Sequence, residues 1–293
     1  MMSLSTFVNC HVKAFDKKPV QLITKYLFFR EERNPIINDN RVILSPAYGT
    51  VIGVSKTNIE SDDSVVNAKG VHYSLKDMVG HDKETVKYLK KFKHIYVMDI
   101  FMSFYDVHTN HVPYISYQQR FKQLKPLMTR NAPMLATEEN LFKENFVDAV
   151  KYTGKYLVNN QRAITSFFCP DLGRRMFTVQ LADDLVNCIV NYNEHQELKL
   201  LLPGQKFGQI RSGSGCSLII PCDDDFDVEP LIEVGYHVEG GIDALFKISK
   251  FKGKVVNEDI DYLYNELITD KTYYDKTEEI THSGLGFGDL EDK

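Results

Sequence analysis

The residues with the clearest chemical potential in this chain are a glycine and a serine between two apolar runs. Gly213 and Ser214 lie within GQKFGQIRSGSGCSLII, residues 204–220. In a constrained turn the Ser214 hydroxyl can attack the Gly213 carbonyl, and β-elimination from the resulting ester leaves a ketone-bearing pyruvoyl group in place of the serine. Such a group would act as a built-in decarboxylase cofactor. A GSG sequence alone is also a common flexible turn, so this hypothesis depends on other residues.

A pair of histidines could supply the base that a serine nucleophile requires. His108 and His111 stand three positions apart in DVHTNHVP, with Pro113 just beyond them. Proline favours extended conformations before it, so we expect the histidines at a strand end or in a loop. Histidine titrates near neutrality, and either ring could act as a general base. The alternatives are surface histidines, or part of a metal site that lacks its third ligand.

Short apolar runs must position these groups, because glycine and proline interrupt the sequence at close intervals. Residues 71–80 combine an extended run with a short helix that Ser74 could cap. Residues 82–93 read as a charged helix, and another helix begins at Thr137. The predicted strands lie in residues 41–46, 49–55, 94–104, 111–117, 164–170 and 175–192, and further short strands follow residue 200. Pro170 to Gly173 are the predicted turn between the strands at 164–170 and 175–192.

This pattern predicts an α+β fold, a β-rich single domain with peripheral helices, rather than a doubly wound parallel sheet. The predicted division is an amino-terminal helical segment at 1–40, the domain at 41–270 and an acidic, mobile tail at 271–293. In the first segment, Leu22, Ile23, Tyr26, Leu27 and Phe29 recur at helical spacing before Asn34 and Pro35. That helix either packs on the domain or, being amphipathic, touches a lipid surface.

Composition gives no support for a nucleic-acid-binding, disulfide-rich or membrane-spanning protein. The chain has 293 residues and a net charge of −5, which gives no argument for nucleic-acid binding. A basic cluster at Lys87, Lys90, Lys91 and Lys93 is either a solvated face or a phosphate or membrane contact. The five cysteines show no CxxC spacing, which favours neither disulfides nor a metal site. With no signal peptide or membrane-spanning run, we expect an intracellular protein, soluble or peripheral to a membrane.

Several segments, taken in order, resemble the phosphatidylserine decarboxylase family. That family shows an SPADG-like turn, a KGxxYSLxxLL-like segment, a DYHRVHMP-like segment, an NER motif and a closing element with GST. The corresponding segments here are SPAYG, AKGVHYSLKDMVG, DVHTNHVP, NQR and PGQKFGQIRSGSGCSLII. They extend over about residues 41–250, and the ordered set is far more specific than any single motif.

The resemblance implies a self-cleaving proenzyme. Ser214 would be the cleavage serine and the precursor of a pyruvoyl cofactor, and Gly213 would end the upstream chain. His111 matches the family's base, and His108 matches the neighbouring histidine of the substrate site. Arg162, in the NQR motif, could bind a carboxylate or phosphate of the substrate, although an arginine there more often makes a structural salt bridge.

The resemblance also suggests partners. Phosphatidylserine, decarboxylated to phosphatidylethanolamine, is the expected substrate, and a smaller amino acid is the alternative. A peripheral membrane contact is expected, and a homodimer is possible. Neither a metal nor nucleic acid is expected.

The sequence departs from the family at important positions. Tyr48 stands where the family has the aspartate that orients the histidine, and a phenol does this poorly. Asp99 and Asp106 are the nearest substitutes in the sequence. Gly215 replaces the threonine of GST, while Ala182 and Asn187 replace glycines. The alternative function is therefore a degenerate member that neither cleaves itself nor decarboxylates.

Two alternative roles for the same turn are weaker. Cys216, preceded by Gly215, could undergo the same acyl shift, but Ser214 is preferred. A P-loop would need Lys after its second glycine, whereas Ser214 and Gly215 follow Gly213.

Overall fold

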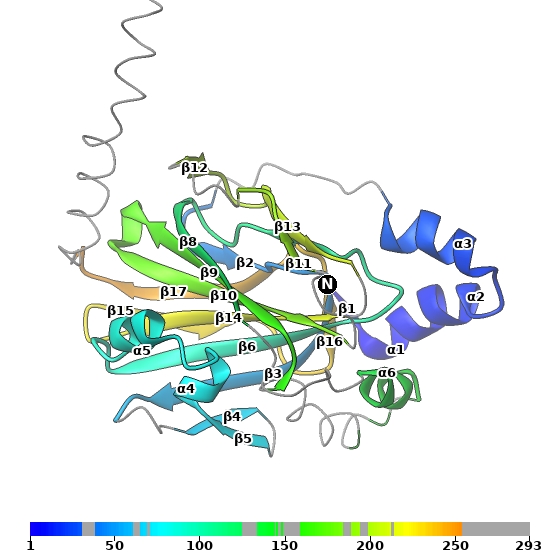
Figure 1. Cartoon of the computed structure of the whole chain (residues 1–293), viewed down its shortest axis with the longest axis horizontal. Helices are drawn as coiled ribbons and strands as arrows, with labels where there is room; N and C mark the ends of the chain where they lie inside the picture. Colours follow the sequence, from blue (N-terminus) through cyan, green and yellow to red (C-terminus); the bar gives the residue numbers. More distant parts are fainter. Residues whose placement is uncertain are drawn as a thin grey trace, which may run out of the picture. The chain divides into compact units, whose positions relative to one another are not determined.

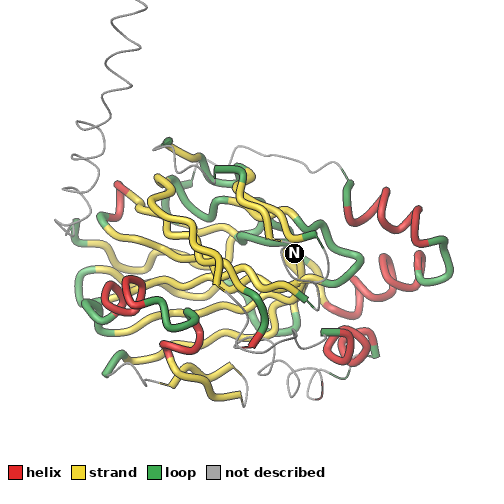
Figure 2. Tube along the Cα trace, in the orientation of Figure 1, coloured by secondary structure: helices red, strands yellow, loops and turns green. Residues whose placement is uncertain are grey.

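The computed structural model describes residues 1–30, 39–60, 65–68, 71–124, 134–143, 145, 148, 159–183, 189–193, 199–211 and 214–253. They all belong to one compact unit, Met1–Val255. Strands dominate this unit and the helices are short (Figure 2). The predicted β-rich α+β class is confirmed.

The described elements are given in the order in which they follow one another along the chain. The strands are β1 (Met2–Ser3), β2 (Val42–Leu44), β3 (Gly49–Asn58), β4 (Val65–Ala68), β5 (Val71–Ser74), β6 (His94–Met102), β7 (Thr109–His111), β8 (Ser116–Leu124), β9 (Arg162–Cys169), β10 (Arg174–Ala182), β11 (Ile189–Asn191), β12 (Leu200–Leu201), β13 (Lys206–Ile210), β14 (Ser214–Cys222), β15 (Phe226–Pro230), β16 (Tyr236–Val238) and β17 (Ala244–Phe251). The helices are α1 (Leu4–Phe7), η1 (Val8–Val12), α2 (Lys13–Phe15), α3 (Val20–Ile23), η2 (Thr24–Phe28), α4 (Leu75–Met78), α5 (Lys83–Leu89), α6 (Leu135–Phe142) and η3 (Pro170–Leu172).

A large antiparallel sheet forms the centre of the unit (Figure 1). Among the described residues it has nine strands, in the order β1, β16, β3, β6, β14, β10, β9, β8, β12. Every residue of β14 is buried, which requires cover on both faces of the sheet. Phe226 and Phe246, from the smaller sheet of β15, β17 and β2, join the core beside Met98 and Leu218. Helix α5 packs on β10, where the Tyr88 ring lies 5.6 Å from Phe177.

Local sequence signals predicted several elements correctly. Ser74 caps α4, because its Oγ accepts a hydrogen bond from the Asp77 amide at 3.1 Å. Gly173 ends the turn after Pro170 with a φ of 60°, a conformation that suits glycine. Two strand predictions were wrong. Residues 175–192 do not form a single strand, since β10 ends at Ala182 in the large sheet and β11 pairs with β13 in another sheet. Residues 111–117 do not form a single strand, since β7 ends at His111 and β8 begins at Ser116, on either side of a proline that cannot donate to a ladder.

In the part that the structure describes, most of the first 30 residues are helical. Helix α3 continues as the π-helix η2, and its buried face carries Ile23, Leu27 and Phe28. Tyr26 and Phe29 are more than half exposed instead. The predicted helix end at Asn34 and Pro35 and the predicted tail at 271–293 lie outside the described residues. Within the part of the chain described, no helix combines the length and the apolar character that a bilayer crossing needs.

Candidate functional site

Ser214 begins β14, His111 ends β7 and His108 directly precedes β7. The chain leaves β6 at Met102, passes through the buried Asp106 and His108, and forms β7, which ends at His111. Strand β13 pairs with β7, and the Ile210 amide donates to the His108 carbonyl at 2.9 Å. Residues 211–213 then connect β13 to Ser214. Since extended residues advance about 3.5 Å each, Ser214 lies within about 14 Å of Ile210.

Ser214 begins the central strand β14 and is completely buried. It pairs in register with Ala182 of β10 and with Met102 of β6. Its hydroxyl donates to the Met102 sulfur at 3.2 Å, and a thioether is a weak acceptor. The Ser214 proton is therefore held loosely, in a dry environment. Gly213 and Asn187 lie outside the described residues.

His108 is a buried neutral imidazole with one unused nitrogen. Its Nδ1 lies 2.8 Å from the Asp106 carbonyl oxygen, which can only accept, so Nδ1 carries the proton. Burial lowers the pKa of His108 to about 4, so the ring is neutral at pH 7. Nε2 is then a lone-pair acceptor, and it has no hydrogen-bond partner among the described residues. The Phe28 ring stacks on the imidazole, with ring centroids 4.0 Å apart.

His111 is held in a tight, mostly backbone environment. Its amide donates to the Pro46 carbonyl at 2.8 Å. A Cβ on Gly240 would lie 2.8 Å from His111 Nδ1, and one on Gly241 would lie 3.0 Å from Cδ2. Gly241 also has a φ of +71°, so glycine is required there for two reasons. The imidazole thus has little freedom to reorient.

Tyr48 contacts His111 where the resemblance expects an acid. The two ring centroids lie 5.8 Å apart at an angle of 65°, an edge-on contact. Tyr48 is buried, and the Arg30 guanidinium lies 5.2 Å from its ring centroid. The position where the family has an acid is therefore filled by an aromatic ring that packs against His111.

Asp106, a candidate for that acid, has a partner that the sequence analysis missed. Its Oδ1 lies 2.6 Å from His237 Nε2, and its Oδ2 accepts from the Ser103 amide at 2.8 Å and hydroxyl at 2.6 Å. Burial alone would raise the pKa of Asp106, but the His237 charge and these hydrogen bonds outweigh it and hold the pKa below its ordinary value. Phe7 stacks on the His237 ring at 3.9 Å.

Asp99, the other candidate acid, lies further along the sheet. It accepts hydrogen bonds from Ser217 at 2.5 Å and from Tyr73 at 3.3 Å. Burial raises its pKa to about 6, despite these hydrogen bonds. Its neighbour Cys216 is also buried, and burial raises the pKa of the thiol, which disfavours the thiolate that an acyl shift needs. These environments favour Ser214 over Cys216 as the nucleophile.

Arg162 makes structural contacts in this fold. Its side chain is fully buried, and Nη1 donates to the carbonyls of Asp77 and Met78 at the end of α4. Burial lowers its pKa to about 10, which leaves it charged at neutral pH. These contacts join α4 to β9. That Arg162 also binds substrate stays a prediction.

A cluster of metal-binding residue types lies elsewhere in the unit. Ligand atoms of His94, Cys222 and Asp227 lie within 4.8 Å of one another. His94 and Cys222 face each other across β6 and β14, a pairing that the cysteine spacing could not indicate. The Lys56 ammonium already lies 3.3 Å from Asp227 and supplies the carboxylate with a cation. We therefore regard the cluster as a structural network.

Comparison with known proteins identifies a family that the chain matches. A family model for phosphatidylserine decarboxylase matches residues 24–245, which is well over half of the chain and includes His108, His111 and Ser214. A search of curated proteins finds no match. The family's activity is that of a carboxy-lyase. The chain therefore belongs to the phosphatidylserine decarboxylase family.

Proposed function

We propose that this protein is a self-processing, pyruvoyl-dependent decarboxylase that converts phosphatidylserine to phosphatidylethanolamine. Family membership supports decarboxylation as the reaction class. The observation that carries the proposal is the position of Ser214. It is buried at the start of the central strand β14, and the strand that precedes it is hydrogen-bonded to His108.

The roles of the histidines follow from their environments. His111 would remove the Ser214 proton, and its tightly packed ring has a fixed orientation for this step. For the reaction to start, the hydroxyl must first leave the Met102 sulfur, which costs little because the thioether is a weak acceptor. His108 would serve the substrate site, where its neutral Nε2 can accept a proton or a hydrogen bond.

The residues present fit a pyruvoyl group at position 214. The serine from which it would form is buried, and burial keeps water from competing with the substrate. The unpartnered Nε2 of His108 leaves one polar atom available to a ligand. The pyruvoyl ketone, once formed, supplies the electron sink that amino-acid decarboxylation needs.

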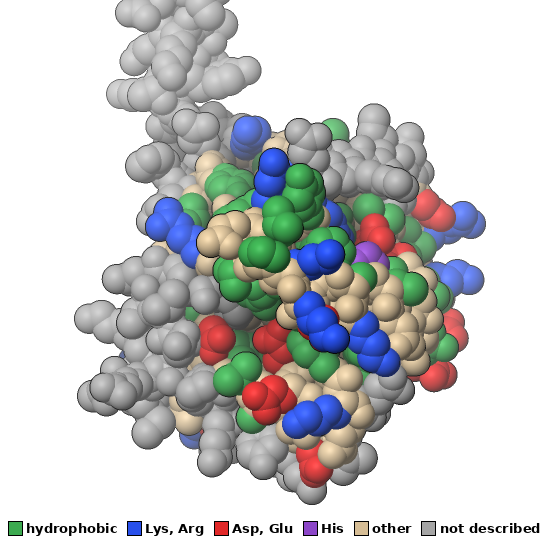
Figure 3. All heavy atoms as spheres, turned by 90° about the vertical axis from the view of Figure 1, so that its right-hand side faces the viewer, with side chains coloured by type: hydrophobic (Ala, Val, Ile, Leu, Met, Phe, Trp, Pro, Cys, Tyr) green, Lys and Arg blue, Asp and Glu red, His purple; other side chains and the backbone are tan. Residues whose placement is uncertain are grey.

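A phospholipid substrate is supported by the surface beside the site. Phe28 of η2 stacks on His108, so the amino-terminal helical segment adjoins the candidate site. The same segment exposes apolar side chains, and Lys and Arg side chains lie near hydrophobic ones on this end of the molecule (Figure 3). The exposed apolar residues are Val20, Leu22, Tyr26 and Phe29, and the cations of the segment are Lys13, Lys17, Lys18, Lys25 and Arg30. Apolar groups flanked by cations suit an anionic lipid surface.

A degenerate, non-processing member is the second candidate function, and Tyr48 favours it. Its ring lies against His111 where an orienting acid is expected. An uncharged ring gives no electrostatic support to a protonated imidazole, and loss of such an acid costs about 10⁴-fold in rate in a related triad. A small amino acid remains the alternative substrate if cleavage occurs without lipid activity.

Denaturing electrophoresis of freshly purified protein tests the proposal. Self-processing should give two fragments, residues 1–213 and 214–293, and mass spectrometry should find a pyruvoyl group at the start of the second. Ser214→Ala should abolish cleavage, whereas Cys216→Ala, the matched control on the same strand, should not. A single intact chain would refute self-processing. Release of carbon dioxide from phosphatidylserine vesicles, compared with free serine, then identifies the substrate.

A further inference from the structure

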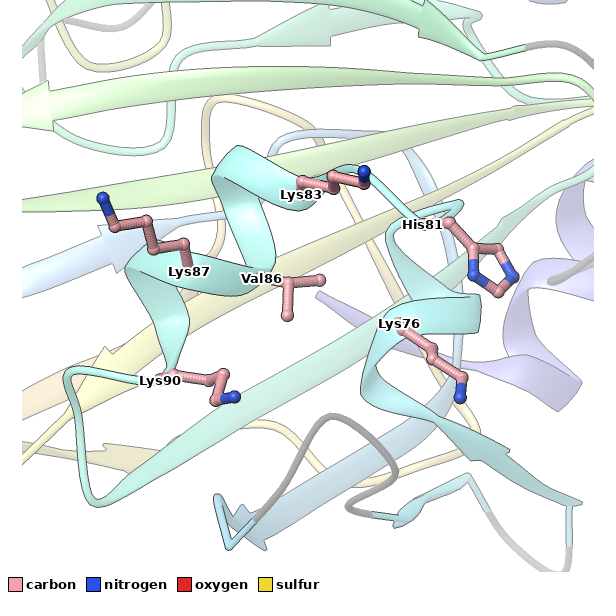
Figure 4. Close-up of a pocket in the computed structure, with 6 residues that line it drawn as sticks. All are labelled: Lys76, His81, Lys83, Val86, Lys87 and Lys90. Atoms are coloured by element: carbon pink, nitrogen blue, oxygen red, sulfur yellow. The ribbon is translucent and has the colours of Figure 1, made fainter.

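A pocket lined by basic side chains lies between α4 and α5 (Figure 4). Its volume is about 370 Å³, within the range of roughly 300–1,000 Å³ that is common for ligand sites. Figure 1 places these two helices well apart from α1, α2 and α3. The residues that line the pocket are Lys76, His81, Lys83, Val86, Lys87 and Lys90.

A sharp chain reversal creates this pocket. Gly80 and His81 have φ values of 57° and 59°, so two successive left-handed residues turn the chain between the helices. Gly80 is also required by space, since a Cβ there would lie 2.5 Å from Leu124. His81 Nε2 lies 3.1 Å from Asp77 Oδ1 on α4. The reversal therefore places Lys76 of α4 and Lys83 of α5 around one hollow.

The carboxylates of this segment have partners other than the pocket lysines, and Asp77 is bonded to His81. Asp82 is buried and binds Arg120 at 2.7 Å and Lys122 at 2.6 Å, both from β8. Glu84 binds Arg120 at 3.2 Å and Arg175 at 3.5 Å. In the part of the chain that the structure describes, no carboxylate forms a salt bridge with Lys83 or Lys87. Asp82 and Glu84 thus neutralise cations of the sheet, while Asp77 pairs with His81 and the lysines line the pocket.

We propose that this lysine pocket is a binding site for a phosphate group, carried either by a free phosphate ion or by an anionic lipid headgroup. Ammonium groups from several side chains can surround a phosphate dianion and donate charge-assisted hydrogen bonds to its oxygens. Partly buried Lys76 and buried Val86 give the hollow a fixed wall, whereas solvated lysines on a flat surface would not.

The test removes charge from the pocket without disturbing its frame. The variant is Lys83→Gln with Lys87→Gln, because both side chains are exposed. The matched control is Lys247→Gln with Lys250→Gln, which removes the same charge from exposed positions on β17. Calorimetric titration with inorganic phosphate measures binding of the free ion. Cosedimentation with equimolar phosphatidylcholine and phosphatidic acid vesicles measures binding of the lipid headgroup, with phosphatidylcholine vesicles as the blank.

Each lysine near an anionic surface strengthens binding about fivefold, so the pocket variant should bind about 25-fold more weakly than the control. A loss confined to inorganic phosphate identifies a free ion as the ligand, and a loss confined to the vesicles identifies the lipid headgroup. If the pocket variant and the control bind both probes equally, the proposal is wrong. These readouts do not require self-cleavage or decarboxylation, so the result stands whether or not the proposed function holds.

Discussion

Replacing His237 with phenylalanine tests the buried contact with Asp106. Phenylalanine keeps a ring that can stack on Phe7, but it removes the 2.6 Å contact to the carboxylate. Asp106 and His237 are both almost fully buried, and Ser103 would be the remaining donor to the carboxylate. Leaving a buried charge without its partner costs about 3–5 kcal/mol, so we expect His237→Phe to lower the free energy of unfolding by that amount at pH 7.

The pH dependence gives this prediction a signature. In the wild type the pKa of Asp106 is depressed, so its contribution to stability is present above the ordinary pKa of about 3.9 and is lost as the pH falls through the folded value. Without His237, less remains to counteract the effect of burial, so the pKa of Asp106 rises. The stability difference between His237→Phe and the wild type should therefore be largest at pH 7 and shrink towards pH 4.

Equilibrium urea denaturation at both pH values measures these differences. His94→Phe is the control, because its partner Asp227 is 28% exposed and its loss should cost no more than about 1 kcal/mol. A double-mutant cycle with Asp106→Asn isolates the pair. The reasoning is refuted if His237→Phe costs under about 1 kcal/mol, or costs as much in the Asp106→Asn background.

Three further predictions follow from other buried groups. Asp99 has a folded pKa of about 6, so the folded state holds a proton that the unfolded chain releases, and stability should fall by up to about 3 kcal/mol as the pH rises from 4 to 6. Asp99→Asn should abolish this pH dependence of the melting temperature, because the hydroxyl partners of residue 99 can reverse their donor roles. If the pH dependence persists in Asp99→Asn, the reasoning is wrong. Tyr48→Asp should increase the cleaved fraction on denaturing gels relative to Tyr48→Phe, at a stability cost of about 3–5 kcal/mol for the lost ring; an unchanged fraction would show that more than the acid is missing. Arg162→Met should lower stability by about 2–4 kcal/mol in urea, because carbonyls of α4 lose a buried donor, and a change under about 0.5 kcal/mol would contradict the assigned contacts.

Local signals made much of the fold predictable. The Ser74 cap, the turn ending at Gly173 and the strand after Gly213 depend on residues close together in the sequence. The ordered motifs also suggest that His108, His111 and Ser214 belong to one site, and this stays a prediction. The contact of Tyr48 with His111 could be anticipated only as a missing acid, because the ring's packing depends on the backbone of residues 240 and 241.

Contacts across long sequence separations escaped prediction. His237 and Asp106 are 131 residues apart, and pairing of β16 with β3 brings them together. No motif surrounds His237 to signal its role. The lysine cluster was visible in the sequence, but whether nearby acids neutralise these lysines depends on where the acidic side chains point. Glu84 points towards the sheet, because it binds Arg120 of β8 and Arg175 of β10.

The stacking of Phe7 on His237 and of Phe28 on His108 links the amino-terminal helical segment to the acid–base chemistry of the site. Burial keeps the pKa of His108 near 4, and the Phe28 ring covers one face of that imidazole. Lifting the segment away would readmit water and return the pKa towards its ordinary value of about 6.5. Attachment of the helices and protonation of His108 are thus thermodynamically linked. Adsorption of the segment to a bilayer, if it moved the segment, would therefore change the protonation of His108. Conversely, acidification would weaken the binding of the amino-terminal helical segment to the rest of the domain.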